Sequence, residues 1–272
     1  MMMDANLVAS LLRCVPCGGE EFTVERNTFH CGGCGRTHAP EAGGYTDMLE
    51  AGGKSRPRPP TVAQQLMESE VFVSLYEHVM RPIFVRIFAG PDAGVPRPEG
   101  EYAIYERWLD VPARGGPWLD LSCGAGFYTQ SLVRSAKGQH VVGIDLSDAM
   151  LEKAAKQLAG MRNVALLRGD ARALPFREGT FSGVLNAGSL HLYADPDAAY
   201  REIFRLLQPG GTYVASTFAE SPRPLGHLGV RMTGIRRTDL PGLPAALSRA
   251  GFVDYEEQRF GDAFIFKVRR PE

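Results

Sequence analysis

Residues 118–126 read WLDLSCGAG, and this stretch decides the fold. A short apolar stretch that ends at a glycine-rich loop is typical of a buried strand of a parallel sheet. Gly124 and Gly126 allow the backbone to approach a ligand closely, at positions where a Cβ atom would clash with it. The segment therefore predicts a ligand-binding loop at the carboxyl end of a strand.

Beyond this stretch, apolar segments alternate with segments of helical periodicity. We expect strands over 118–121, 140–145, 164–167, 181–185 and 212–217, then two more near 252–259 and 262–269. Helices are expected after Gly126, from Ser147 to about 159, from Pro196 to Leu207, and over 242–250. Repeated strand–helix units predict a doubly wound parallel sheet, and the last two strands are close enough to form an antiparallel hairpin. The predicted fold is α/β with a seven-stranded sheet whose last strand is antiparallel.

Four of the five cysteines form two Cys-x-x-Cys pairs near the N-terminus, Cys14 with Cys17 and Cys31 with Cys34. A glycine follows each pair and permits the tight turn that brings two thiolates to one metal ion. The alternatives are two disulfides or a redox Cys-x-x-Cys, both of which a cytoplasmic setting disfavours. We interpret the four cysteines as ligands of a structural zinc ion.

The chain divides into four predicted parts. Residues 1–50 form the zinc-ribbon domain, and the Gly/Pro-rich residues 51–60 form a linker. Apolar residues recur at helical spacing from 61 onward, so we expect 61–110 to be a helical lid over the site. Residues 111–272 form the sheet domain, in which residues 218–237 are an insertion expected to contact the substrate.

Composition narrows the function classes. The formal net charge is -1, which provides no overall electrostatic attraction to nucleic acid or to an anionic membrane. No apolar run approaches the roughly 20 residues that a membrane-spanning helix needs. The first residues do not resemble a secretory signal. We expect a cytoplasmic protein without a membrane partner, and its oligomeric state is left open.

Three loops carry the candidate binding chemistry, and each follows a predicted strand. The first is Asp120–Gly126, the second begins at Asp145, and the third is Gly169–Phe176. Ligands of such sheets bind at the carboxyl ends of the strands, and an acid that ends the second strand can accept both hydroxyls of a ribose. The three loops together predict a site for a nucleoside-containing cofactor.

These loops, together with Asp145–Leu151 and the Leu-x-Pro-Gly-Gly segment at 207–211, resemble the class I S-adenosylmethionine-dependent methyltransferases, specifically the menaquinone/ubiquinone-type group. The resemblance covers about residues 115–220. It departs from the group at Ser122, where glycine is more common. A nicotinamide dinucleotide is the rival cofactor, but it would favour glycine at the position of Thr129.

The resemblance implies a role for each cofactor-binding residue. Asp120 and the backbone from Gly124 to Gly126 would hold the methionyl part of S-adenosylmethionine. Asp145 would bind the ribose, Leu146 would lie against the adenine ring, and Asp170 would accept from the adenine amino group. Ser122, Ala171 and Asn186 are the other predicted cofactor-binding residues.

The segment after the fourth strand, Asn186–Tyr193, would border the reactive methyl group. His191 is the best-placed titratable group there to remove a proton from an oxygen or nitrogen nucleophile. The alternative is that His191 only packs at the lip of the pocket. We name His191 as the candidate catalytic residue and leave both roles open.

Three functions are consistent with these patterns. The first is methyl transfer to a small-molecule acceptor by in-line attack. The second is an RNA base methyltransferase, because a zinc ribbon before such a domain resembles ribosomal RNA guanine-N1 methyltransferases. The third is a protein that binds S-adenosylmethionine without transferring its methyl group. Residues 1–60 contain six Lys/Arg and seven Asp/Glu, whereas an RNA-binding ribbon should be basic. This balance favours the small-molecule acceptor.

Overall fold

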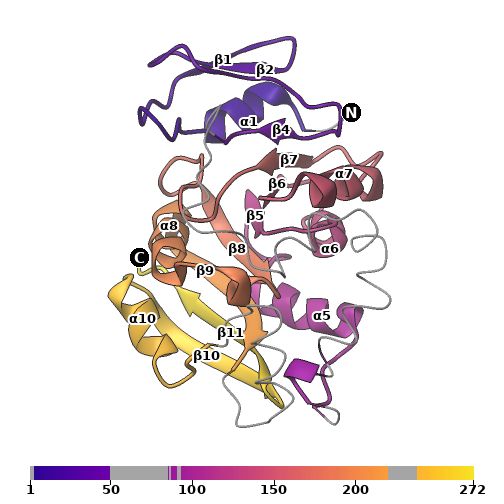
Figure 1. Ribbon diagram of the computed structural model, residues 1–272, viewed down its shortest axis with the longest axis vertical. Helices are drawn as coiled ribbons and strands as arrows, with labels where there is room; N and C mark the ends of the chain where they lie inside the picture. The colour runs from indigo at the N-terminus through magenta and orange to yellow at the C-terminus, as the bar shows by residue number, and fades with distance from the viewer. Residues whose placement is uncertain (1–2, 50–84, 86, 91–92, 220–237) are drawn as a thin grey trace.

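The computed structural model describes residues 3–49, 85, 87–90, 93–219 and 238–272 (Figure 1). The predicted linker over 51–60, most of the predicted lid, and residues 220–237 of the predicted insertion lie outside these ranges. The lid therefore remains a prediction, although the structure describes one helix within 61–110, over Pro98–Leu109.

An eight-stranded sheet forms the centre of the molecule, in the order β10-β11-β9-β8-β5-β6-β7-β4 (Figure 1). Its strands beyond residue 100 are β5 (Trp118–Leu121), β6 (Val141–Asp145), β7 (Val164–Arg168), β8 (Phe181–Ala187), β9 (Leu207–Phe218), β10 (Val253–Phe260) and β11 (Ala263–Arg269). β11 pairs antiparallel with both β9 and β10, and the pairs among β5 to β9 are parallel. The predicted seven-stranded α/β sheet with an antiparallel last strand is confirmed.

Helices cover both faces of the sheet, and each face has its own apolar core. On one face α5 (Pro98–Leu109), α6 (Phe127–Ser135) and α7 (Asp148–Gln157) pack against alternate side chains of the strands, such as Trp118. On the other face lie α8 (Pro196–Leu206) and α10 (Leu243–Arg249), packed against residues such as Leu119 and Val184. This alternation is what a sheet buried on both faces requires.

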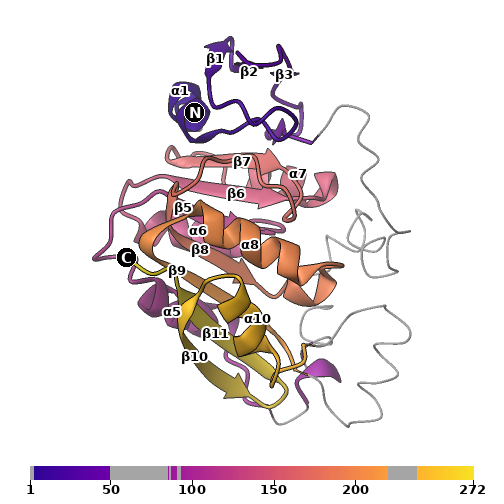
Figure 2. The ribbon, with the colours of Figure 1, turned by 90° about the vertical axis from the view of Figure 1, so that its left-hand side faces the viewer.

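Residues 3–49, called here the N-terminal unit, contain α1 (Ala5–Leu11) and four short strands. β1 (Phe22–Glu25), β2 (Thr28–Cys31) and β3 (Thr37–His38) form a separate antiparallel sheet. β4 (Thr46–Asp47) instead joins the central sheet, where it pairs in parallel with β7. The sequence patterns do not indicate this eighth strand. Figures 1 and 2 show the unit at the β7 edge, opposite the edge formed by β10.

α1 fills a gap in the helical layer of the central sheet. Residues 169–180, which connect β7 to β8, contain no helix. Val8 and Leu12 are buried in the same core as Ile144 and Leu167 of the strands, and Leu12 forms an antiparallel bridge with Phe176. The N-terminal unit therefore shares one apolar core with the central sheet.

Within the described ranges, no helix is both long and apolar enough to cross a membrane.

Candidate functional site

Asp145 links two of the predicted loops at the carboxyl ends of the strands. Its Oδ2 accepts a hydrogen bond of 2.9 Å from the Gly124 amide, and its Oδ1 accepts one of 2.9 Å from the Ser147 amide. Burial raises the pKa of this carboxyl group. Each carboxylate oxygen can accept more than one hydrogen bond, so both retain capacity for a ligand hydroxyl. Asp145 thus braces the glycine loop while remaining able to bind a diol.

The two glycines of the first loop serve different purposes. Both have positive φ angles, 54° at Gly124 and 83° at Gly126. A Cβ atom at Gly126 would lie 3.1 Å from the Cβ of Ala154, so glycine there permits close packing between α6 and α7. A Cβ atom at Gly124 would meet no protein atom within 4 Å. The backbone angle therefore favours glycine at 124, and no protein atom fills the space where a side chain would begin.

Asp120 lies within β5 and is almost fully buried, with 2% of its surface exposed. Thr129 donates a hydrogen bond of 2.6 Å to its Oδ2. Burial raises the pKa of Asp120 to about 7, and the negative charge of Asp145 adds to that rise. A cationic ligand group beside Asp120, such as the ammonium of a methionyl part, would favour the carboxylate form.

Two residues predicted to contact the adenine differ in their surroundings: Leu146 is exposed, whereas Asp170 forms an ion pair within the protein. Leu146 is 48% exposed, which is unusual for a large apolar side chain and leaves a surface on which a ring could lie. The carboxylate of Asp170 instead binds the guanidinium of Arg172 at 2.5 Å, and its Oδ1 accepts from the Arg172 amide. Ala171 is half-buried in the same loop.

A polar cluster that includes Tyr193, which sequence reasoning missed, connects the ends of β5 and β8. Ser122 Oγ lies 2.8 Å from the Tyr193 hydroxyl, and Asn186 Nδ2 donates to that hydroxyl at 2.8 Å. Asn186 Nδ2 also lies 2.7 Å from the Leu121 carbonyl and 2.7 Å from Ser189 Oγ. The buried Oδ1 of Asn186 has no partner among the described residues. An unpaired buried acceptor of this kind is consistent with a ligand donor at the site.

His191 lies in a short 3₁₀ helix, η2 (Leu190–Leu192), directly after this cluster. Its ring is 9% exposed and packs 5.4 Å from the ring of Phe218, measured between centroids. The buried Nδ1 has no partner within the described ranges. Burial lowers the pKa of His191 to about 4. The imidazole is therefore neutral at pH 7, and its conjugate acid is stronger than that of an exposed histidine.

A second polar network, also missed, surrounds a buried carboxylate on α5. Glu101 is 7% exposed and accepts hydrogen bonds from the hydroxyls of Tyr105 and Tyr128. The Tyr105 hydroxyl also contacts Ser216 Oγ at 2.8 Å, and Ser216 Oγ accepts from the Gly188 amide at 2.9 Å. The network joins α5 and α6 to the loop after β8. An acid within the apolar stripe of a predicted helix is the signal that could have identified it.

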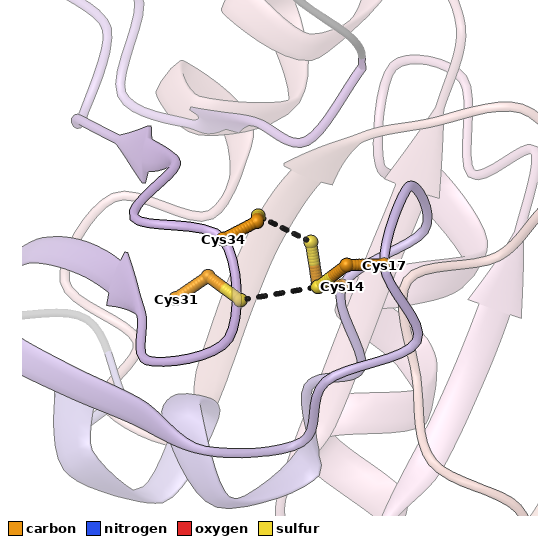
Figure 3. A group of neighbouring side chains, drawn as sticks. All are labelled: Cys14, Cys17, Cys31 and Cys34. Atoms are coloured by element: carbon orange, nitrogen blue, oxygen red, sulfur yellow. Dashed lines mark hydrogen bonds between the residues drawn. The ribbon is translucent and has the colours of Figure 1, made fainter.

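The four N-terminal cysteines come together as predicted (Figure 3). Their Sγ atoms all lie within 4.8 Å of one another, and none forms a disulfide. Cys14 and Cys34 are 3.7 Å apart, Cys17 and Cys31 are 3.6 Å apart, and the Gly19 amide lies 3.4 Å from Cys17 Sγ. His38 is not among them, because its Nδ1 lies 2.9 Å from the carbonyl oxygen of Asp47. The arrangement can hold one four-coordinate metal ion.

Comparison with known proteins identifies the central region. Residues 119–215 match a family model described as a methyltransferase domain. An uncharacterised chloroplastic methyltransferase of Arabidopsis thaliana is 27% identical over 96% of this chain and 75% of its own length. A 2-phytyl-1,4-naphthoquinone methyltransferase of Thermosynechococcus vestitus is 41% identical over 38% of this chain and 46% of its own length. The chain thus matches less than half of that quinone methyltransferase.

The fold is also that of a solved methyltransferase. Phosphoethanolamine N-methyltransferase 2 of Haemonchus contortus, solved with phosphomonomethylethanolamine and S-adenosylhomocysteine, superposes with a TM-score of 0.64. The two share 17% sequence identity, and the superposition covers 79% of this chain and 61% of the other. At this identity the similarity establishes the fold alone.

Proposed function

Because this chain belongs to the class I S-adenosylmethionine-dependent methyltransferases, we propose that it transfers the methyl group of that cofactor to a small-molecule acceptor of the quinone type. The observation that carries the proposal is the bond between Asp145 and Gly124. It places a diol-binding carboxylate and an open glycine loop side by side at the carboxyl ends of β5 and β6, where ligands of this fold bind.

The residues present fit the cofactor. The carboxylate of Asp145 would hold the ribose, the exposed face of Leu146 would carry the adenine ring, and the buried carboxylate of Asp120 would balance the methionyl ammonium. The unpaired Oδ1 of Asn186 adds an acceptor at the inner end of the site. When bound, the cofactor supplies a methyl group that its positive sulfur already activates.

The chain's own residues then have to align an acceptor for in-line attack. His191 is neutral at pH 7, since burial lowers its pKa to about 4, so it can accept a hydrogen bond from an acceptor hydroxyl. Such a contact would orient the acceptor. If the acceptor hydroxyl is the nucleophile, the His191 imidazole would also accept its proton. For a ring-carbon nucleophile the contact alone would suffice.

The quinone-type acceptor rests on the relatives. The naphthoquinone methyltransferase of Thermosynechococcus vestitus is 41% identical over 38% of this chain. The rings of Phe218 and His191 pack together at a tilt of 57°, so an aromatic residue adjoins the candidate catalytic histidine. The insertion after β9, expected to contact the acceptor, lies almost wholly outside the described residues.

We propose further that the four cysteines bind one structural zinc ion. A tetrahedral site with zinc–sulfur bonds of about 2.3 Å has sulfur–sulfur edges of about 3.8 Å. Two Sγ–Sγ contacts, of 3.7 and 3.6 Å, are close to this value. Each joins a cysteine of one Cys-x-x-Cys pair to a cysteine of the other, and all four sulfurs lie within 4.8 Å of one another. This convergence of both pairs supports a shared metal site.

Methyl transfer from a labelled cofactor tests the proposal. The purified protein should be incubated separately with reduced naphthoquinones, with a metabolite extract and with total RNA. Label in the quinol or metabolite fraction is expected. Label in RNA would instead support an RNA base methyltransferase. Tight cofactor binding without label in any fraction would support a binding protein that transfers no methyl group.

A further inference from the structure

Charged side chains link the N-terminal unit to the predicted cofactor loop through Arg168. Arg168, the last residue of β7, donates from Nη1 to Asp47 Oδ2 at 3.0 Å. Its Nε donates to the Leu146 carbonyl at 3.1 Å and lies 3.1 Å from Asp148 Oδ1. A single guanidinium therefore joins a residue of β4 to both sides of the turn that contains Leu146.

Tyr45, the residue before β4, makes a second contact with the same turn. Its hydroxyl donates a hydrogen bond of 2.6 Å to Asp148 Oδ1, and its ring is 7% exposed within the core that contains Leu151 and Ala154 of α7. Burial and the carboxylate of Asp148 raise the pKa of the Tyr45 phenol. The phenol is thus a neutral donor over the whole physiological pH range.

The chain before Tyr45 packs against α7 too closely for side chains. A Cβ atom at Gly43 would lie 2.7 Å from Glu152 Cγ, and one at Gly44 would lie 2.9 Å from the Cβ of Ala155. Gly44 also has a φ of 86°. Contacts this close do not occur between real Cβ atoms and their neighbours. Residues 43–45 therefore form a tight clasp against α7, and these packing contacts are separate from the polar contacts of Arg168.

Backbone hydrogen bonds continue the clasp into the cofactor loop. β4 pairs Asp47 with Arg168, and the Met48 amide donates to the Arg168 carbonyl at 3.0 Å. Arg168 in turn pairs with Asp145 between β7 and β6, and the Gly169 amide donates to the Asp145 carbonyl at 3.0 Å. The position of the Asp145–Leu146 turn is thus fixed from the N-terminal unit on one side and from the glycine loop on the other.

We propose that Tyr45 and Asp47 are positioning residues of the cofactor site: through Asp148 and Arg168 they hold the Asp145–Leu146 turn in the form that binds the adenosine part of the cofactor. This inference rests on the proposed function, since it assumes that Asp145 and Leu146 bind adenosine. The N-terminal unit would then support cofactor binding, and this role does not require the unit to bind RNA.

Tyr45→Phe and Asp47→Asn test the inference, because the first removes the hydroxyl that donates to Asp148, the second removes the charge that pairs with Arg168, and both keep the size of the side chain. Calorimetric titration should show S-adenosylhomocysteine binding to each variant about 3- to 30-fold more weakly than to the wild type, the range for coupling through a packed network. The loss should be equally large for 5′-methylthioadenosine, which retains adenine and ribose but lacks the amino acid. The KM for the cofactor should rise while kcat at saturation stays within about twofold.

Tyr255→Phe is the matched control, because the Tyr255 hydroxyl donates to Glu257 on β10, at the opposite edge of the sheet. Its affinity should equal that of the wild type. If Tyr45→Phe and Asp47→Asn bind both ligands as tightly as Tyr255→Phe, the inference is overturned even where their melting temperatures fall. A wild-type protein that binds neither ligand would instead contradict the proposed function, and the inference with it.

Discussion

Ser122 Oγ lies 2.8 Å from the hydroxyl of Tyr193, and Ser122 has a φ of 59°. A side chain in this left-handed region carries a steric cost of about 1 kcal/mol, which glycine avoids. The hydrogen bond to Tyr193 offsets that cost. The departure from glycine noted in the sequence therefore has a partner 71 residues later, on the loop that follows β8.

This relationship predicts an unusual order of stability at position 122. Ser122→Ala keeps the backbone strain and loses the hydrogen bond, whereas Ser122→Gly loses both the strain and the bond. The glycine variant should have the larger free energy of unfolding by about 1 kcal/mol. Urea unfolding of the two variants measures the difference. An alanine variant as stable as the glycine variant would show that Ser122 is not strained.

Asp120 should make stability depend on pH. Its pKa rises from 3.8 to about 7 on folding because the group is buried, so protonation stabilises the folded state. This contribution is complete below about pH 4 and is lost as the pH rises through about 7. Asp120→Asn, which retains an acceptor for Thr129, should remove it. Urea unfolding of both proteins at pH values of about 4 and about 8 measures the effect; a difference that does not change with pH would contradict the assignment.

The cysteine cluster predicts one zinc ion per chain, measured by elemental analysis of the purified protein. Cys31→Ser should lower the metal content and increase hydrogen exchange in the N-terminal unit, since a structural metal contributes directly to folding. Cys123→Ser is the control, because Cys123 lies in the first cofactor loop, outside the cluster. A metal-free wild-type protein that contains disulfides would refute the zinc proposal.

His191 predicts a pH profile that depends on its role. If it removes a proton, His191→Ala should lower kcat by roughly 10²- to 10⁴-fold with little change in cofactor affinity. The wild-type rate should then rise through a pKa of about 4 rather than near 6.5, because burial disfavours the imidazolium. Steady-state kinetics of both proteins from acidic to neutral pH measures this. Near-normal turnover of the variant at saturating acceptor would show that His191 only lines the pocket.

The central fold was predictable because its signals are local. The strands from β5 to β8 are compact apolar segments, so their positions follow from the chain itself. The juxtaposition of Asp145 with the glycine loop also followed, since carboxyl ends of neighbouring parallel strands must meet. The hydrogen bond from the Gly124 amide to the Asp145 carboxylate could not be predicted and is known only from the structure.

The missed features depend on contacts between distant residues. β4 has two residues, too few to show any periodicity, and it is a strand only because β7 offers an open edge. The left-handed backbone at Ser122 could not be expected from a serine, and Tyr193 reveals its role only through its neighbours. The two glycines at 43 and 44 looked like ordinary turn residues, although α7 is what requires them.

Calorimetric titration with S-adenosylhomocysteine tests the central claim, that Asp145 anchors this cofactor at the carboxyl end of β6, most directly. The account predicts one binding site per wild-type chain and at least about 100-fold weaker binding for Asp145→Ala, because two charge-assisted hydrogen bonds are lost. Asp197→Ala, which changes an exposed acid on α8, should bind as the wild type does. Equal affinity for wild type and Asp145→Ala would contradict the account.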